Sequence, residues 1–228
     1  MFLKGNLKMI TNKDYKKEII RDIDSLGDRS EEIDPKKEGS LLQEIVLSLK
    51  QTMKDNDIVS LSAPQIGYKK RVFCVKFGDT DYRTFVNPII DNVRDLTFAR
   101  ETCHSIEDKE FIRPRYNFIR IIYMTPLGKI ESREVRGRTA VVLQHCIDHL
   151  DGLLLSDIGL EIDEMFDKAP EAEREELLQK YAESLDIKQK ELQKVIEDDE
   201  DLKQINDAIK FIDGVRSGAV ELEKPSNE

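Results

Sequence analysis

The uneven distribution of charge along this chain most strongly limits which part of it can form a folded core. Residues 160–228 carry 10 basic and 21 acidic side chains, a net charge of −11, whereas residues 1–159 carry a net charge of +1. The acidic part includes the run EDDED at 197–201, and its apolar residues form only thin helical stripes. We therefore predict a folded domain over residues 1–159, followed by an acidic helical C-terminal extension over residues 160–228.

The composition of the whole chain excludes several classes of partner. The 228 residues include 36 Lys and Arg and 46 Asp and Glu, and the net charge of −10 disfavours binding to nucleic acid or to an anionic membrane. No stretch approaches the roughly 18 apolar residues of a membrane-spanning helix, and lysines interrupt the first ten residues, which are too short for a secretory signal. Three cysteines do not suggest a disulfide framework in so long a chain. We expect a cytoplasmic protein with no direct nucleic-acid or membrane partner.

The first 159 residues alternate between helical and strand patterns. Apolar residues at steps of three and four predict a helix over 41–53. Runs of β-branched and aromatic residues between turn formers predict strands at 71–77, 84–86, 119–124 and 130–135, the second ending before Asn87 and Pro88. Cys74 alternates with apolar neighbours in the first of these strands and is expected to be a buried core thiol. From Thr139 the period becomes helical again, so the class is α+β, with antiparallel or mixed sheets packed against helices.

Each of the three histidines lies within a few residues of a cysteine. His145 and His149 are four residues apart on a predicted helix, so both imidazoles project from one face, roughly 6 Å apart. This arrangement allows one helix to supply two nitrogen ligands to a metal, and Cys103 could supply a thiolate as the third. The same spacing also occurs by chance on exposed helices. The pair alone is therefore compatible with a metal site and with an ordinary helix surface.

Three motifs accompany these residues. Residues 60–67 read SLSAPQIG, residues 101–105 read ETCHS, and residues 144–152 read QHCIDHLDG. In this order and at these separations they resemble the signatures of the peptide deformylase family, which are a GLAAPQ-like loop, an EGCLS-like segment and a QHExDHLDG-like helix. With Asn87, Pro88 and the stretch 113–128, the resemblance runs from about Ile10 to about Ser156. It implies the peptide deformylase fold, in which sheets surround a central metal-binding helix.

The resemblance also implies a metal, a substrate and the groups that act on it. Cys103, His145 and His149 are expected to bind one divalent metal, Fe²⁺ first and Zn²⁺ or Ni²⁺ in its place, and to leave a position open for water. The implied substrate is the N-formylmethionine of a nascent polypeptide, which the family deformylates during protein biosynthesis. The side-chain amide of Gln65 and the backbone N–H of His104 are expected to donate hydrogen bonds to the developing oxyanion.

Glu101, the first residue of the ETCHS segment, is implied to have a structural role. In the family, the corresponding glutamate holds the loop that carries the cysteine ligand through an ion pair with an arginine. Arg100, Arg113 and Arg115 are the candidates for that partner.

The sequence departs from the family where the chemistry depends on it most. The HExxH glutamate, which takes a proton from the attacking water and passes it to the leaving amine, is Cys146 here. A thiol has an ordinary pKa near 8.5 and one acceptor atom, so this replacement should cost about 3–5 kcal/mol of barrier lowering. Thr102 and His104 replace the usual Gly and Leu of the second motif. Ser60 and Ser62 replace a Gly and an Ala of the first.

Three interpretations follow from this departure. The chain is a deformylase with impaired or altered catalysis, in which Cys146 or another group manages the proton. Alternatively, it is a pseudoenzyme that binds metal and a peptide N-terminus, while the acidic extension binds another, basic protein. In the third interpretation Cys146 joins the other three residues in a closed Cys₂His₂ zinc site, although its place directly after His145 on the helix would require strain.

Overall fold

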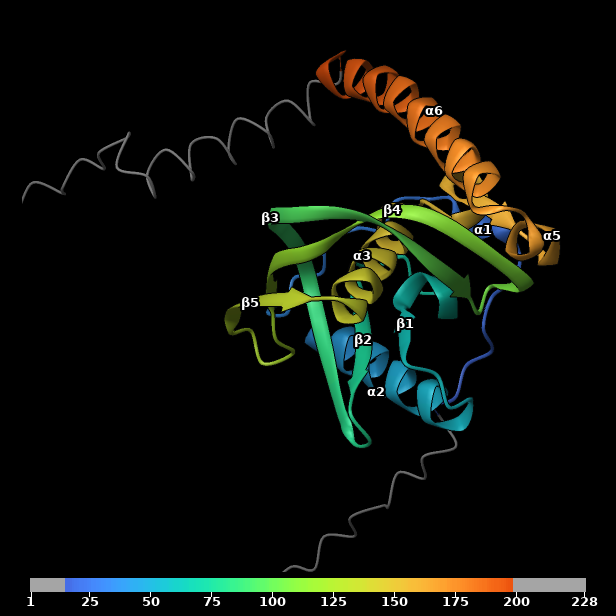
Figure 1. Ribbon diagram of the computed structural model, residues 1–228. Helices are drawn as coiled ribbons and strands as arrows, with labels where there is room; N and C mark the ends of the chain where they lie inside the picture. Colours follow the sequence, from blue (N-terminus) through green and yellow to red (C-terminus); the bar gives the residue numbers. More distant parts are fainter. Residues whose placement is uncertain (1–14, 199–228) are drawn as a thin grey trace, which may run out of the picture. The chain divides into compact units, whose positions relative to one another are not determined.

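The structure is a computed structural model that describes residues 15–198, with side chains as far as Leu185 (Figure 1). The chain divides between Lys168 and Ala169 into two compact units. The elements of the first unit are, in chain order, α1 (Ile23–Leu26), α2 (Gly39–Asp55), β1 (Ser60–Ser62), β2 (Val72–Phe77), β3 (Asp81–Cys103), β4 (Ile106–Met124), β5 (Ile130–Arg136), α3 (Arg138–Leu150), α4 (Leu155–Ile158), β6 (Leu160–Ile162) and α5 (Glu164–Lys168). Because β6 and α5 follow residue 159, the first unit extends beyond the domain that the sequence predicts over residues 1–159. The boundary at residue 159 between a folded domain and an acidic extension stays a prediction.

Six strands form one antiparallel sheet in the order β1-β2-β3-β4-β5, with β6 also paired to β4. The first half of β4 pairs with β6 and its second half with β5, so two short strands share one edge of a long one. The hairpin of β3 and β4 dominates the sheet and runs across the first unit (Figure 1). Helices and an antiparallel sheet in one unit confirm the predicted α+β class.

The strand predicted to end at Val86 continues as β3 through Asn87 and Pro88 to Cys103, so the predicted boundary is wrong. The pairing with β4 shifts register between Val86 and Ile89, where Asn87 adopts a φ of 46°. Such a bulge accommodates a proline because Pro has no N–H to donate to the ladder. The Asn87 amide also exchanges two hydrogen bonds with the backbone of Ile33, at 3.0 and 2.9 Å. The strand therefore bends at this point and continues.

Two apolar clusters lie on opposite faces of β2. One includes Cys74 and the buried face of α2, which contributes Leu42, Ile45, Leu49 and Met53. The other includes the β2 residues Phe73 and Val75 with Phe85, Ile119, Ile121 and the α3 residues Leu143, Cys146 and Leu150. Because successive side chains of a strand point to opposite faces, β2 separates the two helices. Helix α3 thereby becomes the central helix that the resemblance predicted.

Helix α3 is fixed near its middle and just after its C-terminal end. The Gln144 amide donates to the Tyr116 carbonyl at 2.8 Å and accepts from the Tyr116 N–H at 3.1 Å, which ties the helix to β4. After the helix, Gly152 has a φ of 72°, and a Cβ built there would lie 2.4 Å from the Gly27 carbonyl oxygen. Only glycine allows both this backbone conformation and this close approach. Together, these two contacts fix the position of α3 relative to the sheet.

The second unit contains α6 (Glu171–Asp198), which is described here by itself. Its exposed side chains form pairs one turn apart, such as Lys180 with Glu176 at 2.6 Å, while Leu178, Tyr181 and Leu185 are half-buried. This agrees with the prediction of a charged helix with a thin apolar stripe, although the run EDDED at 197–201 lies mostly outside the described residues. In the described part of the chain, no helix is long and apolar enough to cross a membrane.

Candidate metal centre and adjoining cleft

The end of β3 and the face of α3 bring Cys103, His145 and His149 together. One ligand atom from each lies within 4.8 Å of the others, and Cys103 Sγ is 3.3 Å from His149 Nε2. The two imidazole rings are 4.9 Å apart and nearly perpendicular. No other group of three His, Cys, Asp or Glu side chains with this geometry occurs among the residues that the structure describes. The spacing of the two histidines on α3 and the position of Cys103 at the end of β3 therefore bring all three ligand atoms to one place.

The chemistry of these three donors fits a divalent metal. Burial opposes ionisation of the Cys103 thiol, but hydrogen bonds from His145 and His149 outweigh it and lower its pKa to about 5. A thiolate with two imidazoles suits Zn²⁺ and Fe²⁺, and three protein ligands leave a fourth position for water or substrate. The other nitrogen of His149, Nδ1, is buried without a hydrogen-bond partner in the described part of the chain. Its Nε2 is the nitrogen that faces the thiolate.

A buried ion network orients His145. Glu101 accepts two hydrogen bonds from Arg115, at 2.6 and 3.0 Å, and its Oε2 lies 3.0 Å from His145 Nδ1. Burial raises the pKa of a carboxyl group, but the bonds to His145 and Arg115 prevail and lower the pKa of Glu101 to about 2. Because Glu101 occupies Nδ1, the other ring nitrogen of His145 remains for a metal, the usual arrangement around a ligating histidine.

Of the three candidate partners for Glu101, the structure selects Arg115. Arg113 instead pairs with Asp148, which Arg115 also contacts at 2.7 Å. Arg100 pairs with Glu110 and Asp167 away from the site. The sequence analysis did not single out Asp148, although its place three residues after His145 on the same helix is the signal that would have found it.

The 3₁₀ turn at Ala63–Ile66 presents Gln65 to the same point. Gln65 Oε1 accepts from the Ser62 N–H at 2.9 Å, and its Nε2 donates to Ser105 Oγ at 3.1 Å and lies 3.8 Å from Cys103 Sγ. The bond from Ser62 fixes which end of the amide faces the centre. Ser105, which the sequence analysis did not single out, holds that end in place. Gln65 therefore offers an N–H beside the three donors.

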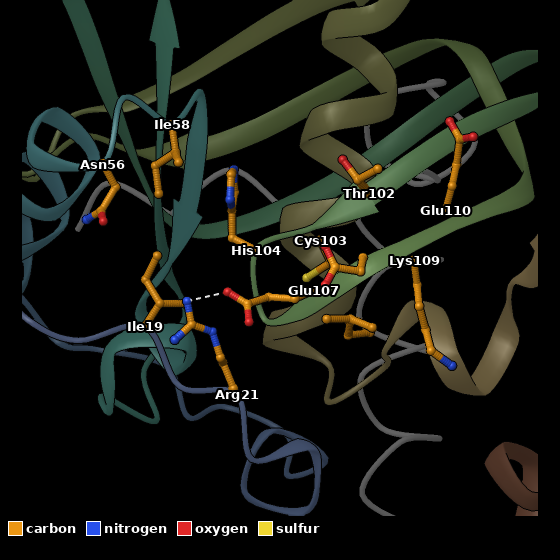
Figure 2. Close-up of a pocket in the computed structure, with 12 residues that line it drawn as sticks. Ile19, Arg21, Asn56, Ile58, Thr102, Cys103, His104, Glu107, Lys109 and Glu110 are labelled. Carbon is orange, nitrogen blue, oxygen red and sulfur yellow. Dashed lines mark ion pairs between the residues drawn. The ribbon is translucent and has the colours of Figure 1, made fainter.

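Two cavities flank the Thr102–His104 segment. The smaller, of about 190 Å³, is called the valine pocket here and is lined by Val59, Ser60, Gln65, Glu101, Thr102, His104, Arg138, Val141, Val142 and His145. The larger, of about 580 Å³, is called the turn pocket; Cys103, His104 and Ile106 line it with Ile19, Ile58 and polar side chains from the start of β4. Figure 2 shows the turn pocket, with the ion pair of Arg21 and Glu107 inside it. Both cavities share Thr102 and His104, and each adjoins the metal centre, the valine pocket at His145 and the turn pocket at Cys103.

Cys146 follows His145 on α3, but it does not line the valine pocket and does not belong to the group of three donors. Its side chain is 1% exposed and packs in the apolar cluster of β2 and α3. Burial raises the pKa of this thiol to about 12, and hydrogen bonds with the side chains of Ser60 and Ser62 only partly offset it. Two departures in the first motif, Ser60 and Ser62, thus meet the departure in the third, Cys146, more than eighty residues later in the chain. The donor group that the structure brings together is therefore Cys103, His145 and His149, without Cys146.

Helix α3 supplies two histidines, the end of β3 supplies a cysteine, and two pockets adjoin these three donors. This arrangement is typical of proteins with a site for a single metal ion. A sequence model described as Polypeptide deformylase matches residues 17–162. The chain therefore belongs to the polypeptide deformylase family, whose members remove the formyl group from the N-terminus of nascent peptides with the help of a divalent metal.

Individual relatives agree with this assignment. The peptide deformylase of Orientia tsutsugamushi strain Boryong is 30% identical over 130 residues, which are 51% of this chain and 72% of that protein. Among solved structures, the peptide deformylase of Thermotoga maritima is 28% identical with a TM-score of 0.57, covering 63% of this chain and 95% of its own. A Met-ala-ser bound peptide deformylase of Acinetobacter baumannii shares the fold at 23% identity, a TM-score of 0.57, and coverage of 62% and 97%.

Proposed function

We propose that this chain is a metal-dependent peptide deformylase with impaired catalysis, acting on the N-formylmethionine of nascent polypeptides. The observation that carries the proposal is the convergence of Cys103, His145, His149 and Gln65 beside one cleft. When bound there, a divalent metal such as Fe²⁺, or Zn²⁺ or Ni²⁺ in its place, would polarise the formyl carbonyl and activate water. We place the reaction in the cytoplasm, where nascent chains are made.

The chain's own residues hold and orient the reacting groups. Gln65 Nε2 donates to the oxygen of the formyl carbonyl as negative charge develops on it, with the backbone N–H of His104 as the second donor. Glu101 keeps His145 in the orientation that presents its free nitrogen to the metal. Losing one oxyanion donor of this kind typically lowers kcat by about 10²–10³.

The proton route is where this chain differs from its family. Cys146 is buried among apolar side chains and keeps its proton, so it neither accepts a proton from water nor passes one to the leaving amine. General acid and base catalysis typically contributes about 10²–10⁴ in rate. We attribute the loss of a rate factor of this size to the replacement of the glutamate by Cys146. The same observation favours a second candidate, a relative that binds metal and a peptide N-terminus without turnover.

The test compares formate release by the parent protein with that by the Cys146→Glu variant, purified without oxygen and loaded with Fe²⁺, on a short N-formylmethionyl peptide. We expect the parent to turn over about 10²–10⁴ times more slowly than the variant. Parent protein carrying His149→Ala is the control and should release no formate. Thermal unfolding of every variant verifies that the new carboxylate has not unfolded the protein.

The outcomes separate the two candidates. Measurable turnover by the parent that disappears in the His149→Ala control supports an impaired enzyme. Turnover by Cys146→Glu alone supports the binding relative, with fold and metal site intact. If neither releases formate although both are folded and hold one metal, the deformylase proposal is wrong.

A further inference from the structure

We propose that Asp148 is a positioning residue of the metal centre: acting through Arg115 and Glu101, it fixes the orientation of the His145 imidazole. This inference rests on the proposed function, because it concerns the metal site beside which the formyl group would react. The juxtaposition behind it is a closed ring of side chains that leaves α3 at His145 and returns to the same helix at Asp148.

The ring joins three elements by contacts of hydrogen-bond length. From α3, His145 Nδ1 lies 3.0 Å from Glu101 Oε2 on β3. The Glu101 carboxylate accepts from Nε and Nη2 of Arg115 on β4, at 2.6 and 3.0 Å. The remaining terminal nitrogen of Arg115, Nη1, lies 2.7 Å from Asp148 Oδ2, back on α3. Because a guanidinium is planar and rigid, contacts on both sides of it fix the plane in which it lies.

The geometry of α3 explains why the ring closes at Asp148. His145 and Asp148 are three residues apart on the helix, so their side chains are neighbours on its surface. One helix therefore supplies both a metal ligand and the anchor of the arginine that holds the partner of that ligand. Without Asp148, Arg115 would be held by Glu101 alone, and neither would be fixed relative to α3 except through His145 itself.

Burial makes the ring sensitive to the loss of one member. Arg115 and Glu101 are each 3% exposed, and the side chain of Asp148 is 15% exposed. A buried N–H that loses its acceptor is costly, since water does not replace the lost hydrogen bond. Arg115 without Asp148 would therefore turn toward another acceptor or toward water, and Glu101 would shift with it.

Asp148 also balances charge next to the site of a divalent cation. It pairs with Arg113 as well as with Arg115, so the group contains two guanidinium groups and, with Glu101, two carboxylates. Replacing Asp148 by asparagine leaves one excess positive charge beside the three metal donors. Like charges repel, and they do so more strongly where water is largely excluded. Metal binding should therefore weaken for two reasons, the loss of orientation and the excess charge.

The test measures metal binding and the imidazole itself, so it does not depend on turnover. Full-length protein with histidine labelled for nitrogen NMR, loaded with Zn²⁺, gives a simple spectrum because the chain contains only three histidines. A carboxylate only accepts hydrogen bonds, so the proton lies on His145 Nδ1. In Asp148→Asn we expect this proton to exchange with water at least about tenfold faster. Zn²⁺ affinity, measured by competition with a chromophoric chelator, should be about tenfold weaker.

Two further variants show whether the effect is specific. Asp148→Glu keeps the carboxylate and should restore part of the metal affinity and of the slow exchange. Asp151→Asn is the matched control: it also removes a carboxylate that pairs with an arginine, Arg71 at 2.5 Å, but one outside the ring. It should leave the exchange of the His145 proton and the Zn²⁺ affinity as in the parent, whatever it costs in thermal stability.

A double variant separates orientation from charge. Asp148→Asn combined with Arg113→Gln restores the balance of charges and still leaves Arg115 without its anchor on α3. We expect part of the Zn²⁺ affinity to return, whereas the proton on His145 should continue to exchange rapidly.

Contrary results distinguish this inference from the proposed function. If Asp148→Asn lowers thermal stability but leaves both the exchange of the His145 proton and the Zn²⁺ affinity unchanged, Asp148 is merely structural and the inference is wrong, while the proposed function stands. The same holds if the double variant restores slow exchange, because charge alone would then account for the effect. If the parent binds Zn²⁺ no better than its His149→Ala variant does, the metal site itself is refuted, and the proposed function with it.

Discussion

Replacing Arg115 by leucine tests whether the buried ion network holds the metal centre. Arg115 and Glu101 are each 3% exposed, and the guanidinium makes contacts of 2.6 and 3.0 Å to Glu101 and 2.7 Å to Asp148. Removing one partner of a buried pair typically costs about 3–5 kcal/mol, because the other charge stays buried without compensation. Arg113 still faces Asp148, so Glu101 bears most of the cost.

This loss corresponds to a decrease in Tm of about 6–20 °C for a protein of this size. Thermal unfolding followed by circular dichroism measures it, with Arg21→Leu as the matched control. The control breaks a pair between side chains that are 60% and 57% exposed, which should cost no more than about 1 kcal/mol. Equilibrium dialysis of the folded Arg115→Leu protein should also show about 10–100-fold weaker metal binding, since Glu101 no longer holds His145 as firmly.

A double variant tests whether the lost stability comes from the unpaired carboxylate of Glu101. In Arg115→Leu with Glu101→Gln, the uncompensated carboxylate becomes a neutral amide, so part of the lost stability should return. If Arg115→Leu lowers Tm no more than Arg21→Leu does, or if adding Glu101→Gln lowers it further, the cost does not come from a buried unpaired charge.

Three further predictions follow from the same structure. Gly152→Ala should destabilise the protein far more than Gly78→Ala, since both glycines have positive φ but only at Gly152 would a Cβ collide with the backbone of Gly27; chemical denaturation of both variants measures the difference, and equal losses would contradict it. Burial raises the pKa of Cys74 to about 11, so between pH 9 and 11 the unfolded thiol ionises before the folded one and stability should fall as pH rises; Cys74→Val should have a shallower slope, and an identical slope would be contrary evidence. His149→Ala should lower the bound metal from one ion per chain to less than 0.1, measured by elemental analysis after dialysis at about micromolar metal, and full occupancy would place the metal elsewhere.

Much of the candidate site was predictable from the sequence because its parts are local. The spacing of His145 and His149 fixes their common helix face wherever the helix packs, and apolar periodicity gave the helices that became α2 and α3. The three motifs indicated the family, which the match over residues 17–162 confirms. Where local chemistry misled, as at Asn87 and Pro88, the pairing partner β4 extended the strand through a bulge.

The sequence by itself determined which residues are available: three donors suited to a metal, an amide in a turn, and a thiol where the family has a carboxylate. Only the tertiary structure decided which of three arginines pairs with Glu101, that Cys146 lies buried with Ser60 and Ser62, and that residues of β1, β3 and α3 line one pocket beside His145. The physical reason is distance along the chain. Helix faces and turns are set by neighbours within a few residues, whereas burial, charge pairing and pocket shape depend on side chains that only the packed sheet brings together.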